Sequence, residues 1–267
     1  PELLTLPGPN GLVTAQDWLS RWVVIPFGMM MFPQISLRFF AGKSLRVMKW
    51  SAVFSSVYLT YIYVFTPAVG MAGRILMPDL AATDTIFPEL LLKYTPTAFA
   101  ALVISGALAA AMSTGDSQLH AASSMVSTDI YKRYIKKDAD EKSMYNAARI
   151  GVLAMGVISV IFALLKPAAL SDLLNLANSG VGVLVPTVIG GMYWKRANKY
   201  GAIAATVIGE ALMVYGTFIH KLAPGGFSIG FCSMILATVV YIVVCLATKP
   251  QKRVGVVVDS INEFFAK

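Results

Sequence analysis

The chain has 267 residues, of which 57% are hydrophobic and only 13% are charged, and its formal net charge is +8. Soluble domains are about half apolar and about a quarter charged, so this composition excludes an ordinary soluble protein and predicts an integral membrane protein in a lipid bilayer. The positive charge does not indicate nucleic-acid binding, because the basic residues fall in short loops between apolar segments. The two cysteines, Cys232 and Cys245, show neither metal-ligand spacing nor a disulfide pattern.

The chain begins with a polar segment, residues 1–17, whose prolines and glycines predict an extracellular loop. Seven apolar segments follow, and each is close to the roughly 20 residues that a membrane-spanning helix needs. They cover residues 18–40, 50–72, 97–125, 147–165, 170–194, 201–219 and 228–247. Helices are expected because open sheet edges cannot satisfy their backbone groups in hydrocarbon. The sequence therefore predicts an all-α membrane fold with about seven transmembrane helices.

Lysine and arginine are concentrated in alternate loops. The loops after the first, third, fifth and seventh segments are rich in them, for example at Lys43, Lys136 and Lys199, whereas the intervening loops are poor and include Asp84. The positive-inside rule assigns the basic loops to the cytoplasm. The expectation is a multi-pass protein of the cell membrane, with its N-terminus outside and the tail 248–267 in the cytoplasm.

Three segments are predicted to be interrupted: the first, the third, which contains the run of polar residues described below, and the fifth. Pro26, Gly28 and Pro33 lie in the first segment, and proline removes a backbone donor while glycine loosens a helix. The fifth segment carries Gly180 and Gly182 ahead of Pro186. It also carries Asn175 and Asn178, and their spacing of three predicts that they share one helix face. The first segment can be interpreted either as a helix with a simple proline kink or as a helix with a functional break, and the sequence does not decide between them.

The third segment contains a run of polar residues within an apolar stretch. Ala110, Ser113 and Thr114 stand at i, i+3 and i+4 and so meet on one helix face, and Asp116 and Gln118 follow. Two hydroxyls, with the Ala110 carbonyl if it is freed from the helix, are hard, neutral oxygen donors that suit a sodium ion which must bind and leave. The alternative is that both hydroxyls bond back to preceding carbonyls or serve as small packing groups. Asp116 favours a functional reading, since an unpaired carboxylate at this depth is costly.

Glu210 and the two histidines are further ionisable residues within or beside the apolar segments. Glu210 lies in the sixth segment, where a lone carboxylate is a functional candidate, but its separation from the other polar positions favours a structural pairing. His120 and His220 lie within or beside separate segments without a triad partner, and His120 is expected at the cytoplasmic end of the third. The sequence has no zinc-protease, serine-hydrolase or phosphate-loop motif, so we do not predict an enzyme.

Three motifs follow one another along the chain. They are Phe32-Pro33-Gln34 with Arg38-Phe39-Phe40; Ala110-Ala-Met-Ser-Thr-Gly-Asp-Ser-Gln118 with Ala121-Ala-Ser-Ser124 and Asp129-Ile-Tyr131; and Gly190-Gly-Met-Tyr-Trp194 with Gly201. In this order they resemble the sodium:solute symporter family, which includes sodium-coupled proline, pantothenate, monocarboxylate and sugar transporters.

The resemblance implies the broken-helix, inverted-repeat fold of the bacterial leucine transporter. Residues 18–194 would form the second five-helix repeat, and residues 201–247 two peripheral helices. The chain, which begins at Pro1 rather than at a methionine, is then expected to be the C-terminal part of a transporter whose N-terminal half is a missing partner.

The resemblance also assigns residues to sites. In the family a sodium ion is held by the groups that match Ala110, Ser113 and Thr114, and its other ligands come from the first repeat. The solute is expected near the bilayer midplane, although the run Met29-Met30-Met31 departs from the more polar or aromatic residues of some members. Asp116 and Gln118 are candidates for coupling or gating. The candidate solute-lining residues are Phe27, Gly28, Met31, Phe32, Asn175 and Asn178.

The predicted function is secondary active transport that couples inward sodium movement to uptake of a small organic solute. The solute is expected to be a carboxylate such as pantothenate or a monocarboxylate, or an amino acid. A membrane solute-sensing module and a non-transporting remnant are the alternatives. The tail 249–267 is too short for a kinase, which argues against the first, and the intact hydroxyl face at Ser113 and Thr114 argues against the second.

Overall fold

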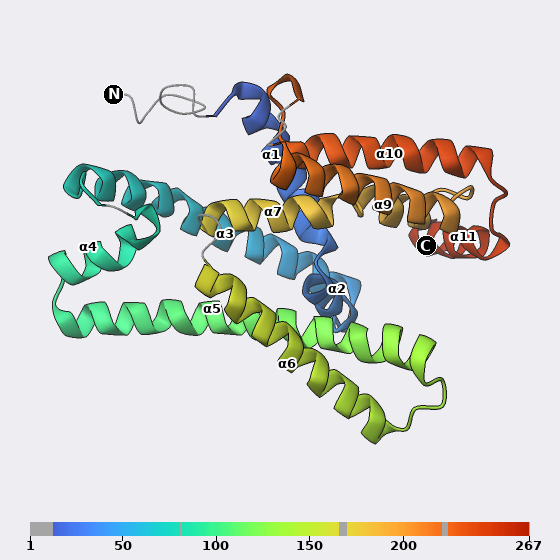
Figure 1. Cartoon of the computed structure of the whole chain (residues 1–267), viewed down its shortest axis with the longest axis horizontal. Helices are drawn as coiled ribbons and strands as arrows, with labels where there is room; N and C mark the ends of the chain where they lie inside the picture. Colours follow the sequence, from blue (N-terminus) through green and yellow to red (C-terminus); the bar gives the residue numbers. More distant parts are fainter. Residues whose placement is uncertain (1–12, 81, 166–169, 221–223, 267) are drawn as a thin grey trace. The chain divides into compact units, whose positions relative to one another are not determined.

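The regular elements of the computed structural model, which describes residues 13–80, 82–165, 170–220 and 224–266, are helices throughout those ranges (Figure 1). Six of them are long and apolar enough to cross a membrane: Leu45–Leu76, Thr97–Ile135, Glu141–Leu165, Asp172–Tyr193, Lys199–Ile219 and Ile229–Ala247. A broken pair, α1 (Ala15–Met31) and α2 (Pro33–Phe40), adds a seventh candidate. The prediction of an all-α membrane fold with about seven spans is confirmed, whereas the inverted-repeat arrangement stays a prediction.

The chain divides into two compact units. Unit 1 consists of Pro1–Phe32 and Ser171–Lys267, and unit 2 consists of Pro33–Leu170. Unit 1 is therefore assembled from two distant stretches of sequence, with unit 2 inserted between them. The division falls at the break after α1, where Phe32 takes an extended backbone conformation (φ −65°, ψ 127°) immediately before Pro33.

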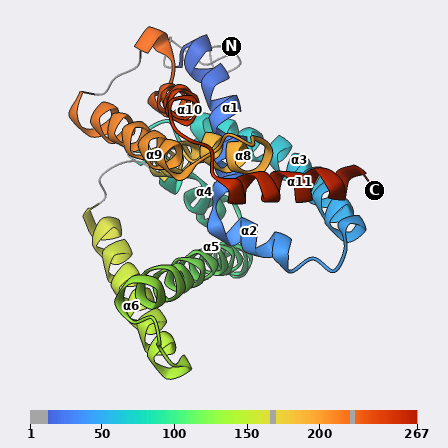
Figure 2. The same ribbon diagram turned by 90° about the vertical axis from the view of Figure 1, so that its right-hand side faces the viewer.

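In unit 1 the closest helix pair is α9 (Lys199–Val214) and α10 (Ile229–Ala247), which run side by side in both ribbon views (Figures 1 and 2). α9 presents Gly201, Ala205 and Gly209, four residues apart, as a stripe of small buried residues. A Cβ atom at Gly201 would overlap the sulfur of Cys245 on α10. Small residues at this spacing let two membrane helices approach closely and gain van der Waals contact without a hydrophobic driving force.

The fifth apolar segment forms two helices, α7 (Leu170–Gly182) and α8 (Val185–Tyr193). A turn separates them, in which the amide of Val183 donates to the carbonyl of Gly180 at 3.1 Å, and Pro186 occupies the first turn of α8, where a missing donor costs nothing. The interruption predicted in this segment is confirmed.

The loop between α8 and α9 is fixed by Asn198. Its Oδ1 accepts from the amide of Gly201 at 3.0 Å, which caps α9, and its Nδ2 donates to the hydroxyl of Thr248 at 2.9 Å. The tail folds as a further helix, α11 (Lys252–Ala266), which lies against α8 and pairs Asp259 with Lys195 at 2.6 Å.

Unit 2 contains α3 (Leu45–Leu76), α4 (Ile86–Tyr94), α5 (Thr97–Met125) and α6 (Glu141–Leu165). α5 continues into a π-helix, η4 (Val126–Ile135), and α6 returns alongside both (Figures 1 and 2). In the most apolar 18-residue stretch of each of α3, α5 and α6, at most 6% of the residues are buried. In the corresponding stretches of the three unit 1 spans that begin at Asp172, Lys199 and Ile229, 22–33% of the residues are buried. These helices therefore depend on lipid or other protein to cover their apolar surface.

Two expectations from the sequence need correction. α5 is one unbroken helix over Thr97–Met125, so the Ala110 carbonyl is not released by a break in the ladder. The loop expected between the second and third apolar segments contains a short helix, α4. Its nine residues are too few to span a bilayer, so it did not stand out as a membrane-spanning segment. The predicted tail after residue 247 contains the helix α11, in which apolar residues such as Val254 and Val258 pack at helical spacing.

Candidate functional site

Three oxygen atoms gather on one face of α5. The hydroxyl of Ser113 donates to the carbonyl of Ala110 at 2.9 Å, and the hydroxyl of Thr114 donates to the same carbonyl at 3.3 Å. This is the back-bonded arrangement that the sequence left open as an alternative. A hydroxyl that donates its single proton keeps two lone pairs, so both side chains retain acceptor capacity for a cation. All three residues are exposed, which leaves that capacity open to groups outside unit 2.

The polar run continues for another turn. Ser117 donates to the carbonyls of Ser113 and Thr114 at 3.0 and 2.9 Å. Asp116 and Gln118 are exposed and make no hydrogen bond or ion pair with the residues that the structure describes. Their role in coupling or gating stays a prediction.

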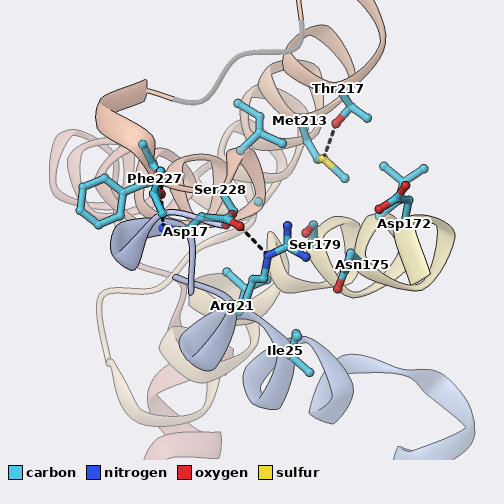
Figure 3. A pocket seen from close by; sticks show the side chains of 16 residues that line it. Asp17, Arg21, Ile25, Asp172, Asn175, Ser179, Met213, Thr217, Phe227 and Ser228 are labelled. Atoms are coloured by element: carbon cyan, nitrogen blue, oxygen red, sulfur yellow. Dashed lines mark hydrogen bonds and ion pairs between the residues drawn. The ribbon is translucent and has the colours of Figure 1, made fainter. Parts of the chain in front are cut away.

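A cavity of about 410 Å³, lined by both polar and apolar residues, lies in unit 1 (Figure 3). Its walls come from α1, α7, α9, the following π-helix η5 (Tyr215–Ile219), the turn η6 (Pro224–Gly226) and the start of α10. The lining residues are Thr14, Asp17, Arg21, Val24, Ile25, Asp172, Asn175, Leu176, Ser179, Met213, Thr217, Gly226, Phe227, Ser228, Ile229 and Gly230.

Two hydroxyls hold the mouth of this cavity together. Thr14 caps α1 by accepting from the amide of Asp17 at 3.0 Å, and it donates to the carbonyl of Gly226 at 2.8 Å. Ser20, which is 1% exposed, accepts from the amide of Ser228 at 3.0 Å. Gly226 has φ of +80°, a conformation that favours glycine and turns the chain back toward α1. The start of α10 is thereby tied to α1.

The charged groups of the cavity are Asp17, Arg21 and Asp172. Arg21 Nε donates to Asp17 Oδ2 at 2.9 Å, a pairing of residues four apart on α1. Figure 3 shows the rest of the guanidinium directed across the cavity toward α7, where Asn175 and Ser179 point inward. A guanidinium with free N–H groups beside an amide and a hydroxyl can bind a carboxylate.

The six predicted solute-lining residues do not come together in one cavity. Asn175 lines the cavity of Figure 3. Asn178 is buried and its backbone packs against Gly28, where a Cβ atom would overlap the Asn178 carbonyl oxygen. Phe27 lines a second, apolar cavity of about 500 Å³ with residues of α8 and α10. Met31 packs against the buried cluster that contains Val24 and Val185, and Phe32 ends α1.

Sequence reasoning missed Thr14, Ser20 and Arg21. The pairing of Arg21 with Asp17 was detectable, because opposite charges four apart on a helix signal contact. The bonds to Gly226 and Ser228 were not, because they join residues more than 200 positions apart.

A family model supplies the assignment. The model described as "Sodium:solute symporter family" matches residues 2–209, more than three quarters of the chain. The chain belongs to the sodium:solute symporter family. The resemblance of the three sequence motifs is confirmed, and with it the expectation of a multi-pass membrane protein.

Curated members of the sodium:solute symporter family show the same relation. The chain is 30% identical over 213 residues to a sodium/pantothenate symporter of Haemophilus influenzae, covering 78% of this chain and 44% of that protein. It is 27% identical to the osmoregulated proline transporter OpuE of Bacillus subtilis, covering 93% and 51%. It is 26% identical to a monocarboxylic acid transporter of Corynebacterium glutamicum, covering 80% and 40%.

The chain spans about half the length of the curated relatives that it matches. All three are named as symporters or transporters, which confirms the prediction that this symporter-family chain is not an enzyme.

Proposed function

We propose that this chain is part of a symporter that couples inward sodium movement to uptake of a small organic solute across the cell membrane. The observation that carries the proposal is the group of neutral oxygens on α5, at Ala110, Ser113 and Thr114, in a chain of the sodium:solute symporter family. The partners of this chain are then the bilayer, the solute and the half of the transporter that would precede Pro1.

Ala110, Ser113 and Thr114 would supply the carbonyl and the two hydroxyls of a sodium site. Neutral hard oxygens suit a cation such as sodium, and without a carboxylate the ion is held loosely enough to leave in each cycle. Inward movement of sodium down its gradient would supply the driving force. Linkage between sodium binding and solute binding would couple this movement to solute uptake. Its remaining ligands would come from the N-terminal half, because these three residues are exposed at the surface of unit 2.

We further propose a solute that bears a carboxyl group. Pantothenate, proline and monocarboxylic acids, which the relatives' names mention, share that group. Arg21 and Asn175 offer N–H donors to a carboxylate in the cavity of unit 1. The cavity would face the outside, as the distribution of basic loops predicts.

The test is sodium titration of solute uptake by the full-length protein carrying Ser113→Ala or Thr114→Ala. Each change removes one oxygen from a site with few, at a cost on the order of 1–3 kcal/mol for an unmade polar contact. This corresponds to a roughly 5- to 150-fold weaker apparent sodium affinity, and solute affinity at low sodium falls with it by linkage.

Matched controls lie on α3. Ser56 and Thr60 are also exposed hydroxyls bonded back to the carbonyl four residues earlier, both at 2.8 Å. Ser56→Ala and Thr60→Ala remove the same local bond and should leave the sodium curve unchanged. Wild-type sodium curves for both Ser113→Ala and Thr114→Ala would reject the ion site. Absence of solute uptake by the wild-type full-length protein, with or without sodium, would instead favour the sensing module or the remnant.

A further inference from the structure

Glu210 is an isolated carboxylate in the middle of a membrane span. It lies near the centre of Lys199–Ile219, formed by α9 and η5, and is partly buried. It forms no ion pair or hydrogen bond with any residue in the described ranges, so the structural pairing expected from the sequence is not found there. Ionised groups at this depth are costly, and intramembrane carboxylates mark ion pathways and proton relays.

Among the described residues, no cation on the helices around Glu210 pairs with it. Arg21 of α1, the cation of the cavity in Figure 3, pairs with Asp17 at 2.9 Å instead. Its Oε2 faces α7, 3.9 Å from the position that a Cβ atom of Gly180 would take. The bases on its own span, Lys199 and His220, stand near the two ends. On the elements packed against α9 or facing Glu210, the titratable residues between 170 and 247 are Asp172, Tyr193, Tyr215, Cys232, Tyr241 and Cys245. None of these is a cation at neutral pH.

The cavity of Figure 3 reaches the same helix faces one turn away. Met213 and Thr217 follow Glu210 at i+3 and i+7, so the three share one face of this span, and both Met213 and Thr217 line the cavity. On α7, Ser179 lines the cavity and precedes Gly180, which faces the carboxylate. Met213, the cavity-lining residue on the turn of α9 that follows Glu210, has an unbranched and flexible side chain.

We propose that Glu210 is a proton-binding site that exchanges its proton with water in this cavity. The neutral acid avoids the cost of an unpaired charge in the span, and a nearby cavity lined in part by polar residues gives the proton a route in and out. The step is a plain proton transfer: the O–H bond of the acid breaks, the carboxylate keeps the electron pair, and water carries the proton away. Glu210 belongs to unit 1, whereas Ala110, Ser113 and Thr114 belong to unit 2.

The test is infrared spectroscopy of the purified full-length protein in lipid, which distinguishes the carbonyl stretch of a carboxylic acid from that of a carboxylate. At about pH 7 an ordinary glutamate is ionised. The wild-type spectrum at this pH should nevertheless contain the C=O band of a protonated carboxylic acid, and the spectrum of Glu210→Gln should lack this acid band. The band should disappear at alkaline pH. Asp172→Asn, which removes the carboxylate of α7, should leave it in place.

An acid band equal in wild-type protein and Glu210→Gln would overturn the proposal. Loss of the acid band on adding sodium at constant pH would show that Glu210 binds sodium rather than a proton, and this result would also overturn the proposal. Should Glu210→Gln fail to fold, carbodiimide labelling of the wild-type protein gives the same decision. Modification of Glu210 that declines as the pH rises supports a protonated acid, and absence of modification in detergent-solubilised protein contradicts it. None of these readouts requires transport, so they stand or fall independently of the proposed symport.

Discussion

Two neighbouring glycines of α8 should respond in opposite ways to the same substitution. A Cβ atom at Gly190 would overlap the ring of Tyr241, lying 2.9 Å from both Cζ and Oη, whereas a Cβ atom at Gly191 would meet nothing within 4 Å. The Tyr241 ring cannot easily move aside, because it is 3% exposed and Trp194 packs edge-on against it at 5.9 Å. Gly190→Ala therefore overpacks the core of unit 1, and Gly191→Ala does not.

The magnitude follows from two opposing effects. Replacing glycine by alanine inside a helix gains about 0.5–1 kcal/mol at either position. Overpacking a well-packed core costs about 1–3 kcal/mol and applies only at Gly190. Helix propensity cancels in the comparison, so Gly190→Ala should be about 1–3 kcal/mol less stable than Gly191→Ala. Gly191→Ala itself should match or slightly exceed the wild-type stability.

The assay is denaturant or thermal unfolding of both full-length variants in the same detergent. A second change, Tyr241→Leu in the Gly190→Ala background, should recover part of the loss, because the two residues are in contact and their effects are not additive. Equal stabilities of the two alanine variants, or a less stable Gly191→Ala, would refute the packing of α8 against α10 described above.

Two more predictions concern loops. The hydroxyl and the amide of Ser143 donate hydrogen bonds to Asp140, and these bonds hold the pKa of the Asp140 carboxyl below its ordinary value of 3.8. The cap that Asp140 provides for α6 is therefore fully formed above pH 3.8 and is lost as the pH falls through the lowered pKa. Protection of the first-turn amides of α6 against hydrogen exchange should fall when the cap is lost in acid. In Asp140→Asn that protection should no longer depend on pH in this range. Cysteines placed near Lys136 or Lys199 should be shielded from impermeant thiol reagents in intact cells, whereas one near Asp84 should be labelled; the reverse pattern would invert the topology.

Much of the fold could be predicted from the sequence because the bilayer fixes the length of each span. Hydropathy alone located the seven apolar segments, and Pro33 and Pro186 marked breaks that the structure contains. The π-helical continuation of α5 over Val126–Ile135 was not predictable, since no residue type specifies it. α11 was detectable in principle, because Val254, Val258 and Ile261 recur at helical spacing, although these residues were predicted only to form a cytoplasmic tail.

The candidate site was predictable only where it is local. The spacing of Ser113 and Thr114 from Ala110 was enough to place their oxygens together, because one helix turn decides it. Asn175 and Asn178 show the limit of such reasoning. Residues three apart differ by about 60° around the helix axis, and here that difference sends one to a cavity and the other into contact with α1.

The bonds of Thr14 and Ser20 to the turn before α10 also constrain how the chain is made. Ser20 and Ser228 are separated by 208 residues, and all of unit 2 is translated between them. At about 5–20 residues per second, a ribosome needs roughly 10–40 s to cover that distance. During this time α1 must wait in the membrane or its translocation channel without its partner, while unit 2, being continuous, can fold behind it. A chaperone or insertase that shelters α1 would act in this interval, and the contact between α1 and α10 can form only after unit 2, α7, α8 and α9 have been made.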